Sequence, residues 1–267
     1  MSKGKTKKIT SGTKEWADTN INLYLGCENG CRYCYAMKIA LRFGRIQSVD
    51  EWKFMKPNLN AINKGFSKKE GRIMFPTSHD ITIESYENCL LVLKKLISAG
   101  NEVLITTKPR LCVITKLISE LNKFKEQIQF RFTITSIDDS ILKFWEPYAP
   151  NFNERFLSLV LACSYHYKTS VSIEPFLDKD PFMLIKKIAP FCSESIWIGK
   201  MNYIKATDIA EAEKPHYKRI REISSWPNIL KIMNNLCFLP DRIKSKIRIK
   251  DSIRNMYAKR GLEVKIQ

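Results

Sequence analysis

The stretch Leu25–Ala40, LGCENGCRYCYAMKIA, places three of the chain's eight cysteines within eight residues. The spacing of Cys27, Cys31 and Cys34 is C-x3-C-x2-C, and no fourth cysteine follows nearby. Structural zinc sites prefer four protein ligands with cysteines in C-x2-C pairs, and iron–sulfur clusters usually take four thiolates. Three clustered thiols therefore indicate a metal or cluster site that leaves one coordination position open for another ligand.

The loop between these cysteines suits a site that folds around a ligand. Cys27 follows a short apolar run, residues 21–26, and Cys34 begins the first helical pattern. The Asn29-Gly30 pair favours a tight turn, and a helix N-terminus stabilises thiolates. The other cysteines lack grouped spacing, so we expect small buried residues and no second cluster at Cys89, Cys112, Cys163, Cys192 and Cys237.

Short β-rich runs alternate along the chain with longer amphipathic stretches. The predicted strands are residues 21–26, 72–77, 102–108, 129–136, 169–176 and 195–202. The predicted helices are residues 36–43, 84–99, 111–123, 153–165, 182–188 and roughly 216–235, the last broken near Trp226-Pro227. Six strand–helix units imply a parallel α/β sheet with right-handed crossovers, either an incomplete (β/α) barrel or an open sheet. In both, reactive residues lie beyond the C-terminal ends of the strands.

The chain is strongly basic, with 45 Lys and Arg against 27 Asp and Glu, a net charge of +18. Such a surplus attracts polyanions, nucleic acid first, although a lysine-rich proteome gives the same composition. We predict a basic N-terminal tail over 1–19, a core over 20–205 and a helical, basic extension over 206–267. In the extension, RIKSKIRIK predicts a strand with a cationic face, and KIRIKDS could close or extend the sheet. The long segment 44–71 could be a lid or an insertion.

The sequence contains neither a membrane anchor nor a secretory signal that we can identify. No apolar run approaches the roughly 18 residues of a membrane span. The N-terminus MSKGKTKKIT is charged and lacks an apolar segment. These features predict a cytoplasmic protein with reduced thiols, which bind metal more often than they form disulfides.

The motif C-x3-C-x2-C, with Tyr33 just before the last cysteine, resembles the radical S-adenosylmethionine (radical SAM) superfamily. This resemblance implies a 4Fe–4S cluster held by three cysteines, with SAM on the fourth iron. It also implies a partial (β/α)6 barrel of the TIM type, here with a small C-terminal extension. In that superfamily one electron cleaves SAM to methionine and a 5′-deoxyadenosyl radical, which abstracts hydrogen from the substrate. A flavodoxin or ferredoxin is the expected electron donor.

Residues 20–205 resemble one branch of that superfamily, the spore photoproduct lyase-like group, also called DNA repair photolyases. The stretches that carry the resemblance are CRYCY, IMFPTSHDITIESYENCLLVLKKLISAG, VLITTKPR and FRFTITSIDDSILKFWEPYAP. The resemblance and the positive charge together favour a nucleic-acid substrate. Two alternatives stay open: a radical SAM enzyme for a small molecule or protein, and a non-catalytic iron–sulfur or zinc protein.

The resemblance also implies a SAM site. The cluster ligands would be Cys27, Cys31 and Cys34. The other implied SAM contacts are the backbone around Tyr33 at adenine, Ser78 and Asp80 at the methionyl amino group, Lys108 at the carboxylate, and Thr133 and Ser136 at the ribose or carboxylate. Lys108 could instead be a solvated lysine at a strand end, and the two hydroxyl residues could be ordinary sheet residues.

The candidate catalytic residues are Tyr35, Thr77 and His79. In the lyase, a cysteine in the loop after the second strand returns a hydrogen atom to the product radical. Thr77 stands at that position here, and a hydroxyl is a far poorer hydrogen donor than a thiol. The sequence therefore argues against dimer reversal by the lyase route. His79 could act as a general acid or base, or could cap its loop.

Glu174 ends the fifth predicted strand and is followed by a proline. This position directs a carboxylate toward the predicted active face of the sheet. Glu174 could bind SAM or the substrate, or form an ion pair with Arg131 or Lys108.

Overall fold

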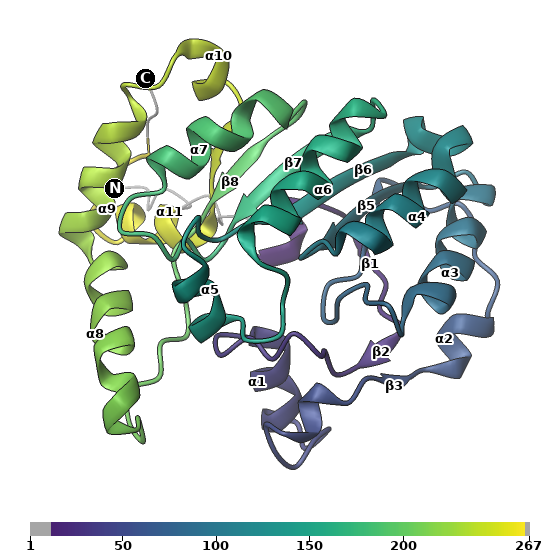
Figure 1. The fold of residues 1–267 in the computed structure, drawn as a ribbon, viewed down its shortest axis with the longest axis horizontal. Coiled ribbons are helices and arrows are strands. Elements are labelled where there is room, and N and C mark those ends of the chain that lie inside the picture. Colours follow the sequence, from purple (N-terminus) through teal and green to yellow (C-terminus); the bar gives the residue numbers. More distant parts are fainter. Residues whose placement is uncertain (1–11, 265–267) are drawn as a thin grey trace, which may run out of the picture.

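The computed structural model describes residues 12–264 as a curled parallel sheet with helices packed on its outer face (Figure 1). Seven strands lie in the order β1-β4-β5-β6-β7-β8-β9, and every neighbouring pair is parallel. They are β1 Thr19–Asn20, β4 Arg72–Phe75, β5 Glu102–Thr107, β6 Ile128–Thr133, β7 Lys168–Ile173, β8 Ile196–Ile198 and β9 Ile247–Ile249. This half-barrel confirms the predicted α/β fold of the partial TIM-barrel type. Most of the predicted basic tail lies outside the described residues.

The helices include all the predicted helical stretches and four more, α2, α5, α10 and α11, that were not predicted. They are α1 Tyr35–Arg42, α2 Leu59–Asn63, α3 Tyr86–Ser98, α4 Leu111–Leu121, α5 Asp139–Trp145, α6 Phe152–Ser164, α7 Phe182–Ile188, α8 Lys214–Ile223, α9 Trp226–Leu236, α10 Asp241–Lys244 and α11 Asp251–Ala258. Short 3-10 turns add η1 Gly12–Glu15, η2 Glu51–Lys53, η3 Asn122–Gln127, η4 Ala189–Phe191 and η5 Glu211–Glu213. Within residues 12–264, no helix is long and apolar enough to cross a membrane.

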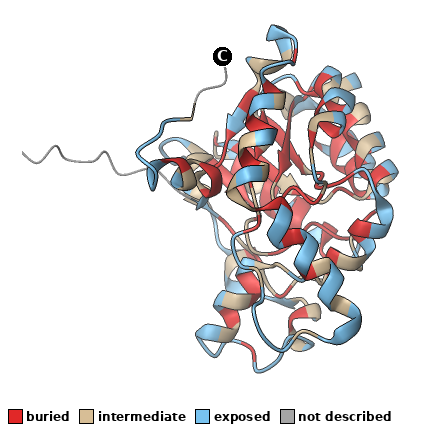
Figure 2. Cartoon of the chain, turned by 90° about the vertical axis from the view of Figure 1, so that its left-hand side faces the viewer, coloured by how far each residue is buried: buried red, intermediate tan, exposed pale blue. Residues whose placement is uncertain are grey.

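The two faces of the central strands differ in polarity, because alternate residues of a strand point to opposite faces. Figure 2 shows that the strands are buried while exposed residues lie on the outer sides of the helices. On β6, Phe130 and Phe132 belong to the apolar core, whereas Arg131 and Thr133 line a cavity. The outer face therefore holds the helices, and the inner face supplies polar groups.

The C-terminal segment contributes a strand to the main sheet. β9 pairs in parallel with β8, so the prediction that KIRIKDS extends the sheet is confirmed. α8 and α9 replace the single predicted helix and are separated before Trp226, as the Trp-Pro pair indicated. The domain boundary after residue 205 stays a prediction.

The N-terminal segment joins the two edges of the half-barrel. η1 precedes the edge strand β1, yet Glu15 binds Lys250 beyond the opposite edge strand at 2.8 Å and Arg254 of α11 at 2.8 Å. The backbone N–H of Gly12 also donates to Asp251 at 3.0 Å. Unpaired sheet edges invite wrong pairing, and covering them removes that risk.

The segment 44–71 packs beside the cysteine loop. Its strand β3 (Lys56–Pro57) pairs antiparallel with β2 (Tyr24–Leu25). Cys27 donates its backbone N–H to the Trp52 carbonyl at 2.8 Å. Trp52 itself is buried, so this segment forms one wall around the loop.

Candidate functional site

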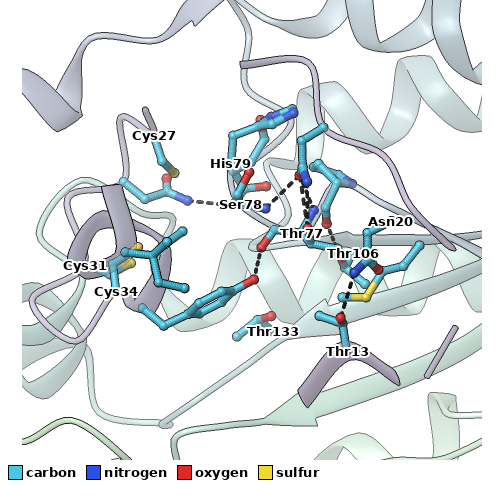
Figure 3. A pocket seen from close by; sticks show the side chains of 18 of the residues that line it. Thr13, Asn20, Cys27, Cys31, Cys34, Thr77, Ser78, His79, Thr106 and Thr133 are labelled. Carbon is cyan, nitrogen blue, oxygen red and sulfur yellow. Dashed lines mark hydrogen bonds between the residues drawn. The ribbon is translucent and has the colours of Figure 1, made fainter. Parts of the chain in front are cut away.

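A cavity of about 1710 Å³ lies at the C-terminal ends of the strands. Figure 3 shows the three cysteines on one side, Thr13 and Asn20 on the other, and Thr133 between them. The predicted site residues that line it are Cys27, Cys31, Tyr33, Cys34, Tyr35, Thr77, Ser78, His79, Asp80, Lys108, Thr133 and Glu174. Pockets for one small molecule are usually about 300–1,000 Å³, so this cavity has room for more than one ligand.

The cysteine loop turns tightly before α1. Cys34 is the N-cap of α1, and its sulfur accepts from the Met37 backbone N–H at 3.4 Å. Gly30 has a φ of 59°, and a Cβ there would lie 2.8 Å from the Tyr148 ring. Glycine at this position therefore permits both the left-handed backbone and the close approach of Tyr148.

The three thiols face one cavity but do not form a site for a single ion. Within residues 12–264, no three Cys, His, Asp or Glu side chains are arranged to hold one metal ion. A 4Fe–4S cubane binds each thiolate to a different iron, which separates its ligands more widely than one ion does. Burial raises the pKa of Cys31 to about 12, so a cluster that binds there must displace the thiol proton. This donor set fits the predicted cluster better than it fits zinc.

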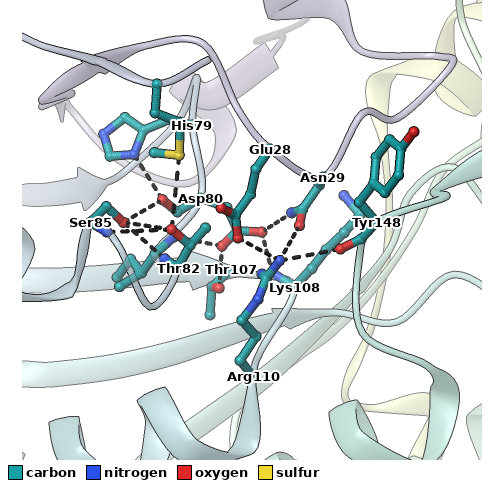
Figure 4. A network of polar contacts seen from close by, with 12 residues as sticks. Glu28, Asn29, His79, Asp80, Thr82, Ser85, Thr107, Lys108, Arg110 and Tyr148 are labelled. Atoms are coloured by element: carbon teal, nitrogen blue, oxygen red, sulfur yellow. Dashed lines mark hydrogen bonds and ion pairs between the residues drawn. The ribbon is translucent and has the colours of Figure 1, made fainter. Parts of the chain in front are cut away.

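Asp80 fastens the cysteine loop to the sheet (Figure 4). Its buried carboxylate accepts from the side chain of Asn29 at 2.5 Å and from the Ile81 N–H at 2.8 Å. It also accepts from the Lys108 N–H at 3.0 Å and from the Thr107 hydroxyl. These four donors occupy both carboxylate oxygens. Asp80 is therefore placed as a support of the site, and its predicted contact with the SAM amino group stays a prediction.

His79 fastens the same loop from its other side. Its Nε2 accepts from the Leu23 N–H at 2.9 Å, and its Nδ1 lies 3.0 Å from the Asp80 carbonyl oxygen. Nδ1 therefore carries the proton and donates to that carbonyl. Burial lowers the pKa of His79 to about 4, which keeps the ring neutral at pH 7. Both nitrogens are committed, so the geometry favours the capping role over the predicted general acid or base.

Asn22 holds the candidate catalytic loop and was not predicted. Its Oδ1 accepts from the N–H groups of Thr77 at 2.7 Å and Ser78 at 2.8 Å. Its Nδ2 donates to the Thr77 hydroxyl at 2.8 Å, and the Tyr35 hydroxyl donates to the Thr77 carbonyl at 2.6 Å. The signal in the sequence was an amide inside the apolar run INLYLG.

Lys108 presents a cation to the cavity. Its Nζ lies 5.6 Å from the centre of the Tyr33 ring. Burial acts to lower the pKa of Lys108, but Cys31 and Glu146 outweigh it and the pKa is raised. No carboxylate in the described part of the chain forms a salt bridge with this ammonium group, so it is available to an anionic ligand.

A buried ion pair lies behind Tyr33. Glu146 and Arg155 are fully buried, and Oε2 of Glu146 is 2.5 Å from Nη2 of Arg155. Oε1 of Glu146 accepts from the Tyr33 hydroxyl and from Thr135 at 2.9 Å. Glu146 lies in the stretch FRFTITSIDDSILKFWEPYAP, which carried part of the family resemblance, but this role of the glutamate was not predicted.

Ser136 is placed differently from the other predicted SAM residues. It does not appear in the cavity lining. Its hydroxyl donates to the Asp178 carboxylate and accepts from the Asp138 N–H at 2.9 Å. This geometry is that of a loop support, and the predicted contact of Ser136 with SAM stays a prediction.

Glu174 points into the cavity beside Lys250. Its nearest ion-pair partner is Lys250, whose Nζ lies 3.8 Å from Oε2, and not the predicted Arg131 or Lys108. A Cβ on Gly199 would lie 2.9 Å from Cγ of Glu174, so the glycine makes room for this side chain. Burial raises the pKa of Glu174 from 4.5 to about 7, although Lys250 opposes the shift.

Glu174→Gln is expected to stabilise the protein at pH 8. The folded state holds a proton on Glu174 up to about pH 7, whereas the unfolded state loses it near pH 4.5. Stability is therefore lost as the pH rises between these values, by about 1–3 kcal/mol at pH 8. Urea unfolding at pH 5 and pH 8 measures this, with the exposed Glu222→Gln as control. A variant less stable than wild type at pH 8 would show that the ion pair with Lys250 outweighs burial.

Solved structures of one enzyme match this architecture. A spore photoproduct lyase mutant with bound AdoMet and dinucleoside spore photoproduct matches with a TM-score of 0.50 and 17% identity, over 84% of this chain and 65% of that chain. The lyase complexed with dinucleoside spore photoproduct gives a TM-score of 0.51 at 17% identity, over the same shares. The chain has the fold of spore photoproduct lyase. It spans just under two thirds of the lyase chains.

Two relatives by sequence carry no stated activity. The uncharacterized protein ORF301 of Acidianus two-tailed virus is 26% identical over 238 residues, 82% of this chain and 76% of the relative. The uncharacterized protein MJ0683 of Methanocaldococcus jannaschii is 27% identical over 194 residues, 70% of this chain and 72% of the relative. No family model matches the chain. The likeness to spore photoproduct lyase therefore concerns the fold, and the function is argued from the cavity.

Proposed function

We propose that this protein is a radical SAM enzyme that reductively cleaves SAM at a 4Fe–4S cluster and acts on nucleic acid. One observation carries the proposal: three clustered cysteines and the ammonium of Lys108, which has no salt-bridge partner within residues 12–264, line the same cavity at the C-terminal ends of a parallel half-barrel. The lyase structure with bound AdoMet shows that a protein of this fold binds this cofactor.

Cys27, Cys31 and Cys34 would hold the cluster, and Lys108 would bind the SAM carboxylate. When bound, the two cofactors supply the 5′-deoxyadenosyl radical. The chain's own task is to position them: Asp80 fixes the cysteine loop, and Asn22 fixes the loop of Thr77. A cytoplasmic location and a flavodoxin or ferredoxin as electron donor belong to the same proposal.

The charge of the cavity supports a nucleic-acid substrate. Seven Lys and Arg line it against three Asp and Glu. Tyr35 and Tyr203 at its edge are exposed by 43% and 60%, and such rings can stack on bases. Of the basic segment 241–260, only Lys250 and Asp251 line the cavity, and α10 lies at the end of the molecule away from α1 (Figure 1). The cavity edge is therefore a better test surface than that segment.

The test is anaerobic reconstitution with iron and sulfide, then SAM and dithionite, with 5′-deoxyadenosine measured by chromatography. Wild type should form it, and Cys31→Ala should not. Faster formation with DNA or RNA, suppressed by salt, would support the substrate. If reconstituted wild type binds no cluster and cleaves no SAM, the proposal is wrong and a zinc or structural role is favoured.

Lys108→Met is expected to raise the Kd for SAM about tenfold to a hundredfold, because a charge-assisted bond to the carboxylate is lost. Calorimetry on the reconstituted protein measures this. Lys116→Met is the matched control, since Lys116 also lies over an aromatic ring, 5.3 Å from Tyr86, but is absent from the cavity lining. Equal SAM affinity in both variants would exclude Lys108 from the carboxylate site.

A further inference from the structure

One wall of the cavity holds polar groups whose hydrogen-bonding capacity the described residues use only in part. On β6 and β7, Thr133 and Ser172 are register partners, and both line the cavity. Neither hydroxyl has a hydrogen bond within residues 12–264. Arg131 and Glu174 lie on the same face of these strands, because they follow the period of two. We name these four residues the β6–β7 wall.

The buried guanidinium of Arg131 is the strongest evidence that the β6–β7 wall binds a ligand. The residue is only 2% exposed, and its Nη1 has no hydrogen-bond partner. Its Nε donates to Ser170 at 3.1 Å, and its guanidinium lies 4.8 Å from the Trp16 ring and 5.3 Å from the Trp197 ring. Burying a cationic N–H without an acceptor is costly, so a ligand that supplies an acceptor would be bound strongly.

In the loop after β4, the polar groups that line the cavity are already bonded within the protein. There the Asp80 carboxylate has four protein donors, and both nitrogens of His79 are bonded. Those groups hold loops in place and have little capacity left for a ligand. On the β6–β7 wall, by contrast, Nη1 of Arg131 and the hydroxyls of Thr133 and Ser172 have no hydrogen-bond partner among the described residues.

The charges of the wall select the chemistry of the ligand. Arg131 offers only donors, and Glu174 offers acceptors once it is ionised. Within residues 12–264 no ion pair joins Arg131 to Glu174, and Lys250, which lies 3.8 Å from Glu174, is bound more closely to Glu15, at 2.8 Å. A phosphate would meet the Glu174 carboxylate unfavourably. A neutral group with a carbonyl next to an N–H can accept a hydrogen bond from Arg131 and donate one to Glu174.

We propose that the β6–β7 wall reads the lactam edge of a nucleobase, as found in uracil, thymine and guanine. Arg131 donates to the ring carbonyl, Glu174 accepts the ring N–H, and Thr133 and Ser172 bond to the remaining polar atoms. Cytosine offers an acceptor where Glu174 requires a donor and is rejected. This inference rests on the proposed nucleic-acid substrate and names the bases that it would contain.

The test measures binding alone, without SAM or reductant. Fluorescence of Trp16 and Trp197, which flank Arg131, reports titrations with uridine, N3-methyluridine and cytidine at pH 8. Uridine should bind at least about tenfold tighter than N3-methyluridine or cytidine. In these two nucleosides the ring N–H is blocked or absent, so the Glu174 carboxylate has no donor. Arg131→Lys should weaken uridine by about tenfold, since lysine lacks the planar fork.

In Glu174→Gln, the ratio of the Kd for cytidine to the Kd for uridine should fall about tenfold, because glutamine can donate to the cytosine ring nitrogen. Glu222→Gln, exposed on α8, should leave the preference unchanged. Because Glu174→Gln is expected to be more stable than wild type at pH 8, unfolding would not explain a change. Equal binding of uridine and N3-methyluridine, an unchanged preference in Glu174→Gln, or no uridine binding at millimolar concentration would each overturn the inference. Failure of the proposed function would be seen in a different assay, in which the reconstituted protein would form no 5′-deoxyadenosine from SAM.

Discussion

Arg155→Met is expected to destabilise the protein by about 3–5 kcal/mol, because it leaves the Glu146 carboxylate buried without its cation. Both side chains are fully buried, 2.5 Å apart. Burial alone would raise the pKa of Glu146, but Arg155, Lys108 and the bond from Tyr33 hold it below its ordinary value. Removing Arg155 therefore leaves the Glu146 carboxylate without its cation. This carboxylate accepts from the hydroxyl of Tyr33, and the Lys108 ammonium lies over the Tyr33 ring.

Urea unfolding at pH 7 measures this loss. The double variant Glu146→Gln/Arg155→Met should recover part of it, since both charges are then gone. The control is Lys94→Met, which breaks the exposed pair with Glu120 at 2.6 Å and should cost at most about 1 kcal/mol. If Arg155→Met cost no more than Lys94→Met, the buried pair would not be a main support of Tyr33.

The parts of the site that the sequence predicted are local in the chain. The cysteine spacing lies within eight residues, and most of the longer strands and helices follow their own periodicity, whereas β1, α2, α5 and α11 were not predicted. The role proposed for Lys108, just after β5, followed from the family resemblance of the stretch VLITTKPR. Such signals need no knowledge of which distant segments meet.

The parts that were missed depend on pairings between distant segments. Asn22 reaches Thr77, Asn29 reaches Asp80, and Lys250 reaches Glu15 across the two edges of the sheet. The family resemblance placed Asp80 at the SAM amino group, and His79 was interpreted either as a general acid or base or as a cap of its loop. Their hydrogen-bond partners, which only the folded chain shows, favour a supporting role for both residues.

Asp80→Asn is expected to lower the free energy of unfolding by about 2–4 kcal/mol and to loosen the cysteine loop. One asparagine oxygen can still accept, but the new NH2 group must face two of the four present donors. Either the side chain of Asn29 or the Thr107 hydroxyl then lacks an acceptor. Because Asn29 lies between Cys27 and Cys31, the thiols lose their fixed positions along with it.

Two measurements separate the parts of this prediction. Urea unfolding reports the loss of stability, and the rate of thiol labelling by a maleimide in the protein without cluster reports the loop, with Cys31 accelerated several-fold. The matched control is Asp178→Asn, whose carboxylate accepts from Ser136 and from the Ile137 N–H at 3.2 Å outside the cavity lining. It should lose stability without exposing Cys31. Labelling that is unchanged in Asp80→Asn would mean that the loop is held by Arg110, which binds Glu28 at 2.8 Å and Asn29 at 3.1 Å, and not by the carboxylate of Asp80.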